Sequence, residues 1–165
     1  MIGVTQHLIV IRNMRLPKGI TGFSPISDSI SELNDAQKLK RILGVIKAFG
    51  KHHIIGSIGL TSSSNYYRIK LIELMSQDDF DLLINPNGMY ACCVDPASMW
   101  MNLKFMNVPG SILNFLSEDL IFLSKDILTQ PIKAEYLEQL AQEELEQIYY
   151  WKTTKFGEVI FNGYD

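Results

Sequence analysis

Two apolar segments joined by a turn constrain the fold of this chain more than any other part of its sequence. Residues 81–84 (DLLI) and 89–94 (MYACCV) flank the sequence NPNG at residues 85–88. Asparagine, proline and glycine favour the backbone angles of tight turns, and apolar runs on both sides suit paired strands. The segment therefore predicts a β-hairpin over residues 81–94.

Two segments have the spacing of amphipathic helices. Asn34 or Asp35 can cap a helix by accepting a backbone N–H bond, and Gly50 is placed where a helix commonly stops. Pro131 suits the start of a later helix, in which an apolar stripe lies opposite a row of glutamates. The residues of that stripe are Leu137, Leu140, Ala141, Leu145 and Ile148.

Other segments are less defined. Residues 6–11 (QHLIVI) are apolar and rich in β-branched side chains, which predicts a buried strand. Residues 52–60 and 66–75 fit either a strand or a helix. Residues 98–106 and 111–128 are apolar, and we expect them to contribute helical core.

Helices and hairpins without a regular alternation of strand and helix predict an α+β fold. We expect a single domain over residues 1–165, with several helices and a small antiparallel sheet that includes the hairpin near 81–94. A mainly α fold is the alternative. Gly157 should end the last helix, and residues 158–162 then form a short edge strand or a docked tail.

The sequence also bears on location. We find no apolar segment long enough to cross a bilayer and no pattern of a secretion signal. Cys92 and Cys93 are neighbours, and a disulfide between neighbours strains its preferred geometry, which favours two reduced thiols. We therefore expect a cytoplasmic protein that does not act at a membrane.

Charge is distributed unevenly along the chain. Residues 1–70 carry ten basic and three acidic side chains, whereas residues 71–165 carry five basic and fifteen acidic ones. Such asymmetry can steer a charged partner. The glutamates of the late helix predict a surface that recognises a partner protein, such as a basic one, although they also suit the solvated side of any helix. The predicted partner-binding residues are Glu135, Glu138, Glu143 and Glu146.

No motif for catalysis, a cofactor or a metal is present. A small enzyme would need His52 or His53 beside a carboxylate such as Asp79, and the sequence does not fix that proximity. Zinc could use the same histidines with Cys92 and Cys93, but adjacent residues of a strand point to opposite faces. We therefore predict no catalytic residues, no metal and no cofactor.

A nucleic-acid-binding accessory protein is a third function to consider. Lys40 and Lys47 are a heptad apart and could share a helix face, and Tyr66 and Tyr67 could stack on bases. The chain is nevertheless acidic overall, with a net charge of −3, and contains no nucleic-acid-binding motif. This function therefore ranks behind protein binding.

Residues 150–165 (YWKTTKFGEVIFNGYD) resemble the C-terminal signature of immunity proteins from bacterial contact-dependent growth inhibition and related polymorphic toxin systems. The matching elements are the tryptophan, the basic spacer, GEVIFN and the final aromatic–aspartate pair. The resemblance covers about a tenth of the chain, and Thr153 stands where the pattern has a proline.

The resemblance implies a small cytoplasmic protein without enzymatic activity. Such a protein binds a cognate toxin domain, often a nuclease, and neutralises it by stoichiometric association. The resemblance also implies that the shared tail is structural, so that Trp151, Gly157, Phe161 and Asp165 maintain the fold rather than contact the toxin.

Overall fold

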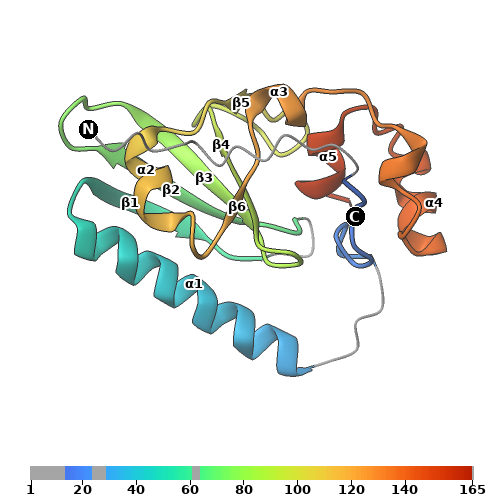
Figure 1. Cartoon of the computed structure of the whole chain (residues 1–165), viewed down its shortest axis with the longest axis horizontal. Helices are drawn as coiled ribbons and strands as arrows, with labels where there is room; N and C mark the ends of the chain where they lie inside the picture. The colour runs from blue at the N-terminus through green and yellow to red at the C-terminus, as the bar shows by residue number, and fades with distance from the viewer. Residues whose placement is uncertain (1–13, 24–28, 61–63, 165) are drawn as a thin grey trace.

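A six-stranded sheet lies at the centre of the computed structural model, which describes residues 14–23, 29–60 and 64–164 (Figure 1). The first five strands follow one another in chain order, each antiparallel to the next, and β6 pairs parallel with β4. The strand predicted over residues 6–11 lies outside the described residues. The strands are β1 (His52–Ile58), β2 (Tyr67–Glu73), β3 (Asp79–Asn85), β4 (Tyr90–Val94), β5 (Phe105–Met106) and β6 (Ile121–Phe122).

The predicted hairpin is confirmed, because β3 and β4 pair across a turn at residues 86–89. Asn85 lies opposite Tyr90, and its side-chain oxygen accepts a 2.8 Å hydrogen bond from the Asn87 N–H. Gly88 has a φ of 102°, a left-handed conformation that glycine adopts without steric strain. The turn residues therefore determine this connection.

Both segments with an ambiguous pattern contain strands. In β2 the buried Tyr67, Ile69 and Leu71 alternate with more exposed residues, which is the period of a strand. β1 pairs with β2, and its register shifts between Ile54 and Gly56, which is a β-bulge. Pairing between the strands therefore outweighs the helical spacing that the same residues offer.

Two helices, α1 (Ser29–Phe49) and α2 (Gly110–Leu116), cover one face of the sheet (Figure 1). α1 begins before the predicted cap at Asn34 or Asp35, because no glycine or proline interrupts the preceding turn. It ends before Gly50 as predicted, and Gly50 has a φ of 63°. The buried residues that these helices add to the core are Ile42, Ile46, Ile112 and Leu116.

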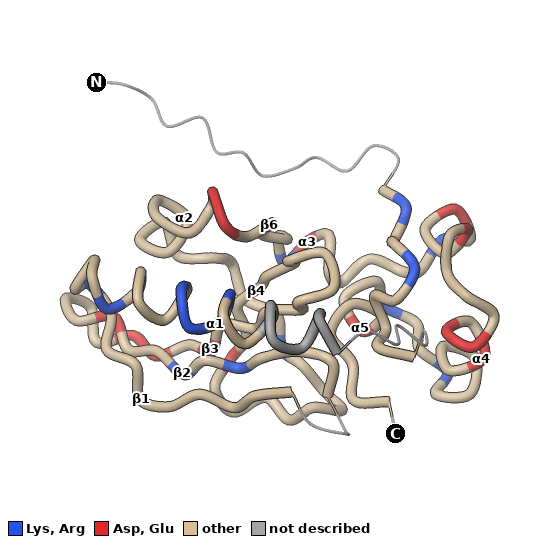
Figure 2. Tube along the Cα trace, turned by 90° about the horizontal axis from the view of Figure 1, so that it is seen from below, with Lys and Arg blue, Asp and Glu red and all other residues tan. Residues whose placement is uncertain are grey.

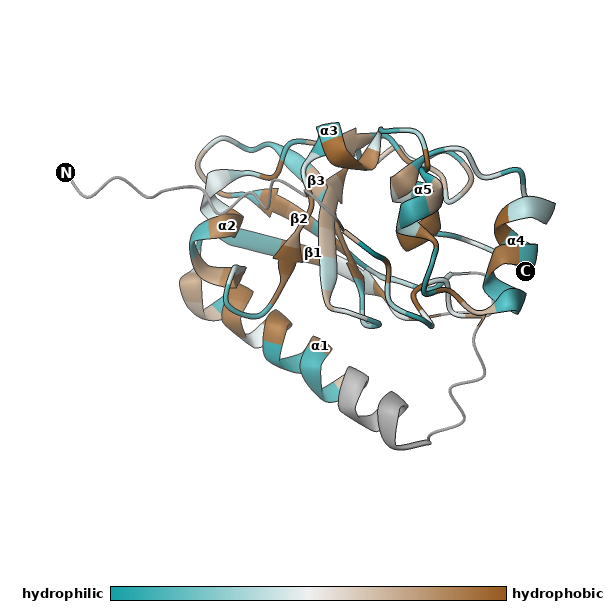
Figure 3. Ribbon diagram, turned by 45° about the vertical axis from the view of Figure 1, so that its right-hand side comes forward, coloured by the Kyte–Doolittle hydropathy of each residue, from teal (hydrophilic) through white to brown (hydrophobic). Residues whose placement is uncertain are grey.

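The opposite face of the sheet is covered by α3 (Lys125–Leu128), α5 (Phe156–Ile160) and the loop at residues 16–20. Figure 3 shows hydrophobic residues along the central strands and in α5. β4 contributes to both cores, because Cys92 packs on this side and Cys93 packs on the side of α1. The adjacent cysteines therefore point to opposite faces, as predicted.

Residues 158–162 form no strand, and Gly157 does not end a helix. Gly157 instead lies inside α5, which docks against the sheet. A Cβ atom on Gly157 would lie 2.6 Å from the Phe105 ring and 2.9 Å from the carbonyl oxygen of Leu128. The docked tail is thus confirmed and the edge strand is wrong, because glycine allows a helix to approach β5 closely here.

The helix predicted over residues 98–106 is also wrong, and the one over residues 111–128 is interrupted. The first segment is a loop that leads into β5. In the second, β6 separates α2 from α3, because the backbone N–H groups of Ile121 and Leu123 each donate a 2.9 Å hydrogen bond along β4. Pairing with the sheet outweighs the local helical pattern.

The long helix predicted after Pro131 is two separate elements. A 3₁₀ helix, η1 (Ala134–Tyr136), is followed by a turn and then by α4 (Gln142–Tyr150). Ala141 has an extended backbone, and its N–H donates to the Glu144 carboxylate at 3.0 Å, so that α4 starts immediately after it. This side-chain cap interrupts the apolar stripe of the prediction.

The elements form an α+β fold, as predicted, and not a mainly α fold. Among the residues that the structure describes, no helix combines the length and apolar character needed to cross a membrane.

Candidate protein-binding surface

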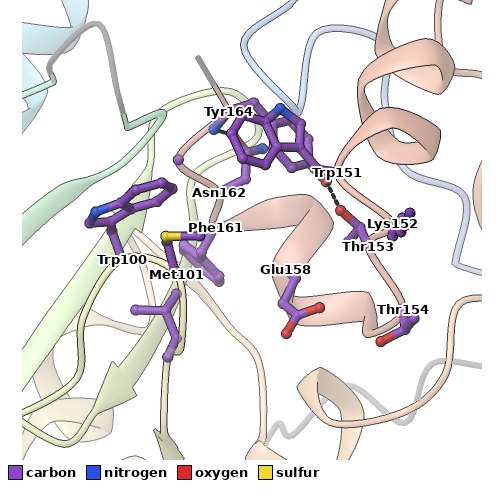
Figure 4. Close-up of a pocket in the computed structure, with 12 residues that line it drawn as sticks. Trp100, Met101, Trp151, Lys152, Thr153, Thr154, Glu158, Phe161, Asn162 and Tyr164 are labelled. Atoms are coloured by element: carbon purple, nitrogen blue, oxygen red, sulfur yellow. Dashed lines mark hydrogen bonds between the residues drawn. The ribbon is translucent and has the colours of Figure 1, made fainter.

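A groove of about 280 Å³ opens where α4 ends (Figure 4). Residues 100, 101 and 103, from the loop between β4 and β5, line one side of it. Residues 151–154, which follow α4, line the other side, and residues 158 and 161–164 of the C-terminal tail complete it. The groove is therefore built from segments that are distant in sequence.

Aromatic rings form much of the groove. The rings of Trp100 and Trp151 are 6.4 Å apart and almost perpendicular, at 82°. Trp151 is nearly parallel to Tyr164, with ring centroids 6.2 Å apart. The Tyr164 hydroxyl is 2.5 Å from the hydroxyl of Thr153, and burial raises the pKa of Tyr164 to about 12, so the phenol is neutral at physiological pH. Both tryptophans of the chain thus line the groove.

Large apolar side chains around the groove are exposed to solvent. Met101 is 68% exposed, and Tyr149, at the end of α4, is 87% exposed. Exposed apolar patches of this kind mark interaction sites, and tryptophan and tyrosine often anchor protein interfaces. We call this patch the aromatic surface. It consists of Trp100, Met101 and Trp151, which line the groove, and of their exposed neighbours in sequence, Met99, Tyr149 and Tyr150.

A partly buried ion pair positions the loop that carries residues 99–101. Arg68 on β2 donates from Nε to Asp81 on β3 at 2.5 Å. Its two terminal nitrogens donate to the carbonyl oxygens of Ser98, at 2.9 Å, and Pro96, at 3.2 Å. Because one guanidinium binds both the sheet and the loop, it fixes where the loop presents its apolar side chains.

Glu144 positions α4. Its carboxylate is fully buried and accepts four hydrogen bonds. Oε1 accepts from the N–H of Thr21 at 3.1 Å and from the hydroxyl of Thr21 at 2.7 Å. Oε2 accepts from the N–H groups of Gly19 and Ala141, each at 3.0 Å. These bonds connect α4 to a loop that lies more than a hundred residues earlier in the chain.

Three asparagines hold the same loop against the tail. The side-chain amides of Asn65 and Asn85 each donate to the carbonyl oxygen of Ile20 at 2.8 Å. Both amides also donate to the carbonyl oxygen of Ile160, at 3.0 and 2.6 Å. The side-chain amide of Asn162 donates instead to the carbonyl oxygen of Thr21, at 3.2 Å. A network of this kind restrains the tail that forms part of the groove.

The four predicted glutamates are exposed but do not share a helix. Glu135 belongs to η1, and Glu138 lies in the following turn, 3.1 Å from Arg15 in an ion pair. Glu143 and Glu146 lie on α4, three residues apart on its exposed side, and Figure 2 shows acidic residues on this helix. The prediction that all four lie on one helix is therefore wrong, and Glu143 and Glu146 are the two that lie on the helix leading to the aromatic surface.

The prediction did not include Glu144 or the groove. Glu144 had a usable signal, because it is four residues from both Leu140 and Ile148 and so lies on the apolar stripe. Trp100 had none, since no sequence pattern places it beside Trp151. Of the residues that the tail resemblance predicts to maintain the fold, Gly157 and Phe161 are buried, and Asp165 lies outside the described residues.

His52 is buried at the start of β1 and does not meet Asp79. Its Nε2 lies 3.2 Å from the Ser111 hydroxyl, and its buried Nδ1 contacts no hydrogen-bond partner among the described residues. Burial lowers the pKa of His52, although the nearby Glu73 carboxylate opposes this shift. Hydrogen bonds from Ser76 and Ser111, and to a smaller extent the charges of His52 and Lys51, lower the pKa of Glu73.

His53 and Asp79 are also not brought together. Each lies opposite Ile72, on either side of β2, which separates the two backbones by about 10 Å. In the part of the chain that is described, no three histidine, cysteine, aspartate or glutamate side chains are grouped as metal ligands. Burial also raises the pKa of Cys92 and Cys93 above the ordinary thiol value.

The residues considered for nucleic-acid binding do not form one surface. Tyr66 and Tyr67 are buried in opposite cores, so their rings are not exposed for stacking on bases. Lys40 and Lys47 are exposed on α1, where Figure 2 shows basic residues, and Arg41 pairs with Asp119 at 3.0 Å. The basic side of α1 therefore has no aromatic platform from these tyrosines.

The fold and the surface together define an α+β domain with an exposed aromatic groove at the end of α4. No family model matches the sequence, and no curated protein or solved structure matches it.

Proposed function

We propose that this chain is an immunity protein that binds a cognate bacterial toxin domain in the cytoplasm and neutralises it by stoichiometric association. The observation that carries the proposal is the aromatic surface, in which the exposed Met99, Trp100, Met101, Tyr149 and Tyr150 accompany the half-buried Trp151, and in which Trp100, Met101 and Trp151 line the groove. Side chains of these types are enriched at the centres of protein interfaces.

The physical properties of this surface suit a tight complex. Burying Tyr149 and Tyr150 would remove a large exposed apolar area from water, which contributes roughly 25 cal/mol per Å². The loop and helix that carry the surface are fixed by Arg68 and Glu144, so less conformational entropy is lost on binding. Glu143 and Glu146 add negative charge on the exposed side of α4, the helix that ends at this surface, and this charge would attract a basic partner.

The C-terminal tail gives independent support. Residues 150–165 resemble the tail of immunity proteins, and the same segment lines the groove. The resemblance implies a structural role for Trp151, whereas its place in the groove favours a role in binding as well. The proposal therefore assigns Trp151 to both the fold and the interface.

A protection assay tests the function. The toxin domain to use is the one encoded by the gene directly upstream, expressed in a bacterial host with and without this chain. We expect restored growth with the chain present, and a purified 1:1 complex by calorimetry. An upstream gene without a toxin domain, or a toxin domain that neither binds the chain nor is neutralised by it, would contradict the proposal.

The acidic pair on α4 gives a finer prediction. Replacing both Glu143 and Glu146 with lysine should slow association by roughly tenfold at low salt and reduce its salt dependence, because charges at an interface edge steer the encounter. Asp78→Lys with Glu118→Lys changes the net charge equally at exposed sites on other elements, and it is the control. Equal association rates for the two double variants in stopped-flow measurements would exclude the α4 glutamates.

A further inference from the structure

A buried histidine connects the start of β1 to α2. His52 is only 5% exposed, and two side chains of α2 contact its ring. The Ser111 hydroxyl lies 3.2 Å from Nε2, and the centroid of the Phe115 ring lies 6.0 Å from that of the imidazole. The Phe80 ring of β3 meets the imidazole nearly edge-on at 5.7 Å. The histidine therefore contacts both α2 and the sheet on which α2 lies.

The hydroxyl of Ser111 determines which nitrogen of the neutral ring carries the hydrogen. A hydroxyl has one hydrogen to donate, and Ser111 donates it to the carboxylate of Glu73 on β2. Ser111 can therefore only accept from Nε2 of His52, which leaves a lone pair on Nδ1. Nδ1 is buried and has no hydrogen-bond partner among the described residues. A second proton would consequently enter the ring at an atom that has no acceptor there.

The charges around His52 do not remove the cost of that second proton. Glu73, which lies opposite His52 in the sheet, favours the protonated ring, and the neighbouring Lys51 opposes it. Burial has the largest effect and lowers the pKa of His52 below its ordinary value of 6.5. The contacts from α2 and β3 are a hydroxyl and two aromatic rings, which carry no charge. A buried cation without an acceptor is costly in a protein interior.

α2 depends on its contacts with the rest of the chain. It has seven residues, and no side-chain hydrogen bond caps its start at Pro109. A helix of this length is unstable by itself in water, because the few backbone bonds do not repay the cost of the first turn. Its buried residues, Ile112 and Leu116, pack in the core between α1 and the sheet. Weakening the contacts of α2 should therefore release the whole helix.

From these contacts we infer that His52 is an acid-sensitive latch, which holds α2 against the sheet while the ring is neutral and releases it when the ring takes up a proton. Release places the ring in water, where both nitrogens can donate to solvent. It also separates Phe115 from Phe49 of α1, which stacks on it at 4.4 Å, and exposes the apolar side of α2. The inference concerns a different part of the molecule from the aromatic surface and does not rest on the proposed function.

Amide hydrogen exchange tests the latch, with each measured rate divided by the intrinsic rate at the same pH. In the released state His52 titrates near its ordinary value of 6.5, so the open population can rise by up to about tenfold between pH 7.5 and 5.5. We expect the protection of the α2 amides to fall towards that limit. The amides of α5, on the opposite face of the sheet, should change much less.

Two variants separate the latch from a general effect of acid. His52→Gln keeps a side chain that can form a hydrogen bond with Ser111 but cannot take up a proton. In this variant the protection of α2 should no longer depend on pH. His53→Gln changes the adjacent, exposed histidine in the same way, so it is the matched control and should keep the full dependence.

Three results would overturn the inference: an equal loss of protection in α2 and α5 of the natural chain, no loss in either helix, or a pH dependence of α2 that persists in His52→Gln. The first two require only the natural chain, so the test stays decisive even if the variant does not fold. Toxin neutralisation is measured separately by growth at neutral pH, so failure of the latch leaves the proposed function unaffected.

Discussion

Replacing Glu144 with glutamine tests how strongly one buried carboxylate holds the fold together. The variant keeps the size of the side chain but replaces one acceptor oxygen with an NH₂ group, which donates hydrogen bonds and cannot accept them. In the natural chain both oxygens accept, two bonds each, from Thr21, Gly19 and Ala141. At least one buried N–H must therefore lose its partner.

The size of the effect follows from these four bonds. If the NH₂ group faces Gly19 and Ala141, two backbone donors are left without an acceptor. If it faces Thr21, the hydroxyl can turn to accept and only the Thr21 N–H is left. Each unsatisfied buried donor costs about 1–3 kcal/mol, and bonds to a charged acceptor are the stronger ones, so we expect a loss of about 2–4 kcal/mol.

Urea unfolding followed by circular dichroism measures this loss as a lower midpoint with an unchanged slope. Hydrogen exchange adds a local readout, because the amide protons of Gly19 and Ala141 should exchange faster in the variant. Glu143→Gln is the matched control, since Glu143 is the adjacent residue and is exposed, and its effect should stay within about 0.5 kcal/mol. If Glu144→Gln is as stable as this control, Glu144 does not have the role assigned to it.

Two further predictions concern the packing of α5 and the titration of His52. Gly157→Ala should lower the free energy of unfolding by about 1–3 kcal/mol, because the new methyl group would lie 2.6 Å from the Phe105 ring. Gly44→Ala in α1 is the control, because its methyl group meets no atom within 4 Å and should be neutral or stabilising. Equal urea midpoints for the two variants would contradict this. Burial lowers the pKa of His52 below its ordinary value of 6.5, so the unfolded chain binds a proton at this residue more readily than the folded chain does. The stability that neutral His52 allows is therefore complete above pH 6.5 and is lost as the pH falls below that value. His52→Gln should reduce the loss of stability between pH 7.5 and 5.5, and the exposed His53→Gln should not; an unchanged pH profile in His52→Gln would refute the assignment.

Local sequence patterns predicted the fold where the deciding interactions are close in sequence. The hairpin followed from the turn-forming sequence NPNG at residues 85–88, and the end of α1 followed from Gly50. The helix predicted over residues 98–106 and the long helix after Pro131 failed for a different reason. In the first, β5 pairs with β4, a contact that leaves no mark in the local pattern. In the second, Glu144 lies on the apolar stripe but caps Ala141 and is held by the distant Gly19 and Thr21.

The candidate site was less predictable than the fold. Exposed glutamates on α4 were foreseen, but Glu138 pairs with Arg15, and the aromatic groove arises only when the chain brings Trp100 to Trp151. Arg68 fixes the loop beside the groove through bonds to the carbonyl oxygens of two residues that lie about thirty positions later in the chain. Function-bearing contacts between distant segments require the tertiary structure.

The neighbouring thiols of β4 have a consequence for how the two cores can be followed in solution. Cys92 is sealed in the core under α5, and Cys93 in the core under α1. A thiol reagent therefore reaches one sulfur only when the C-terminal layer lifts, and the other only when the α1 layer lifts. The chain thus carries, one peptide bond apart, separate reporters of whether its two layers open together or one at a time.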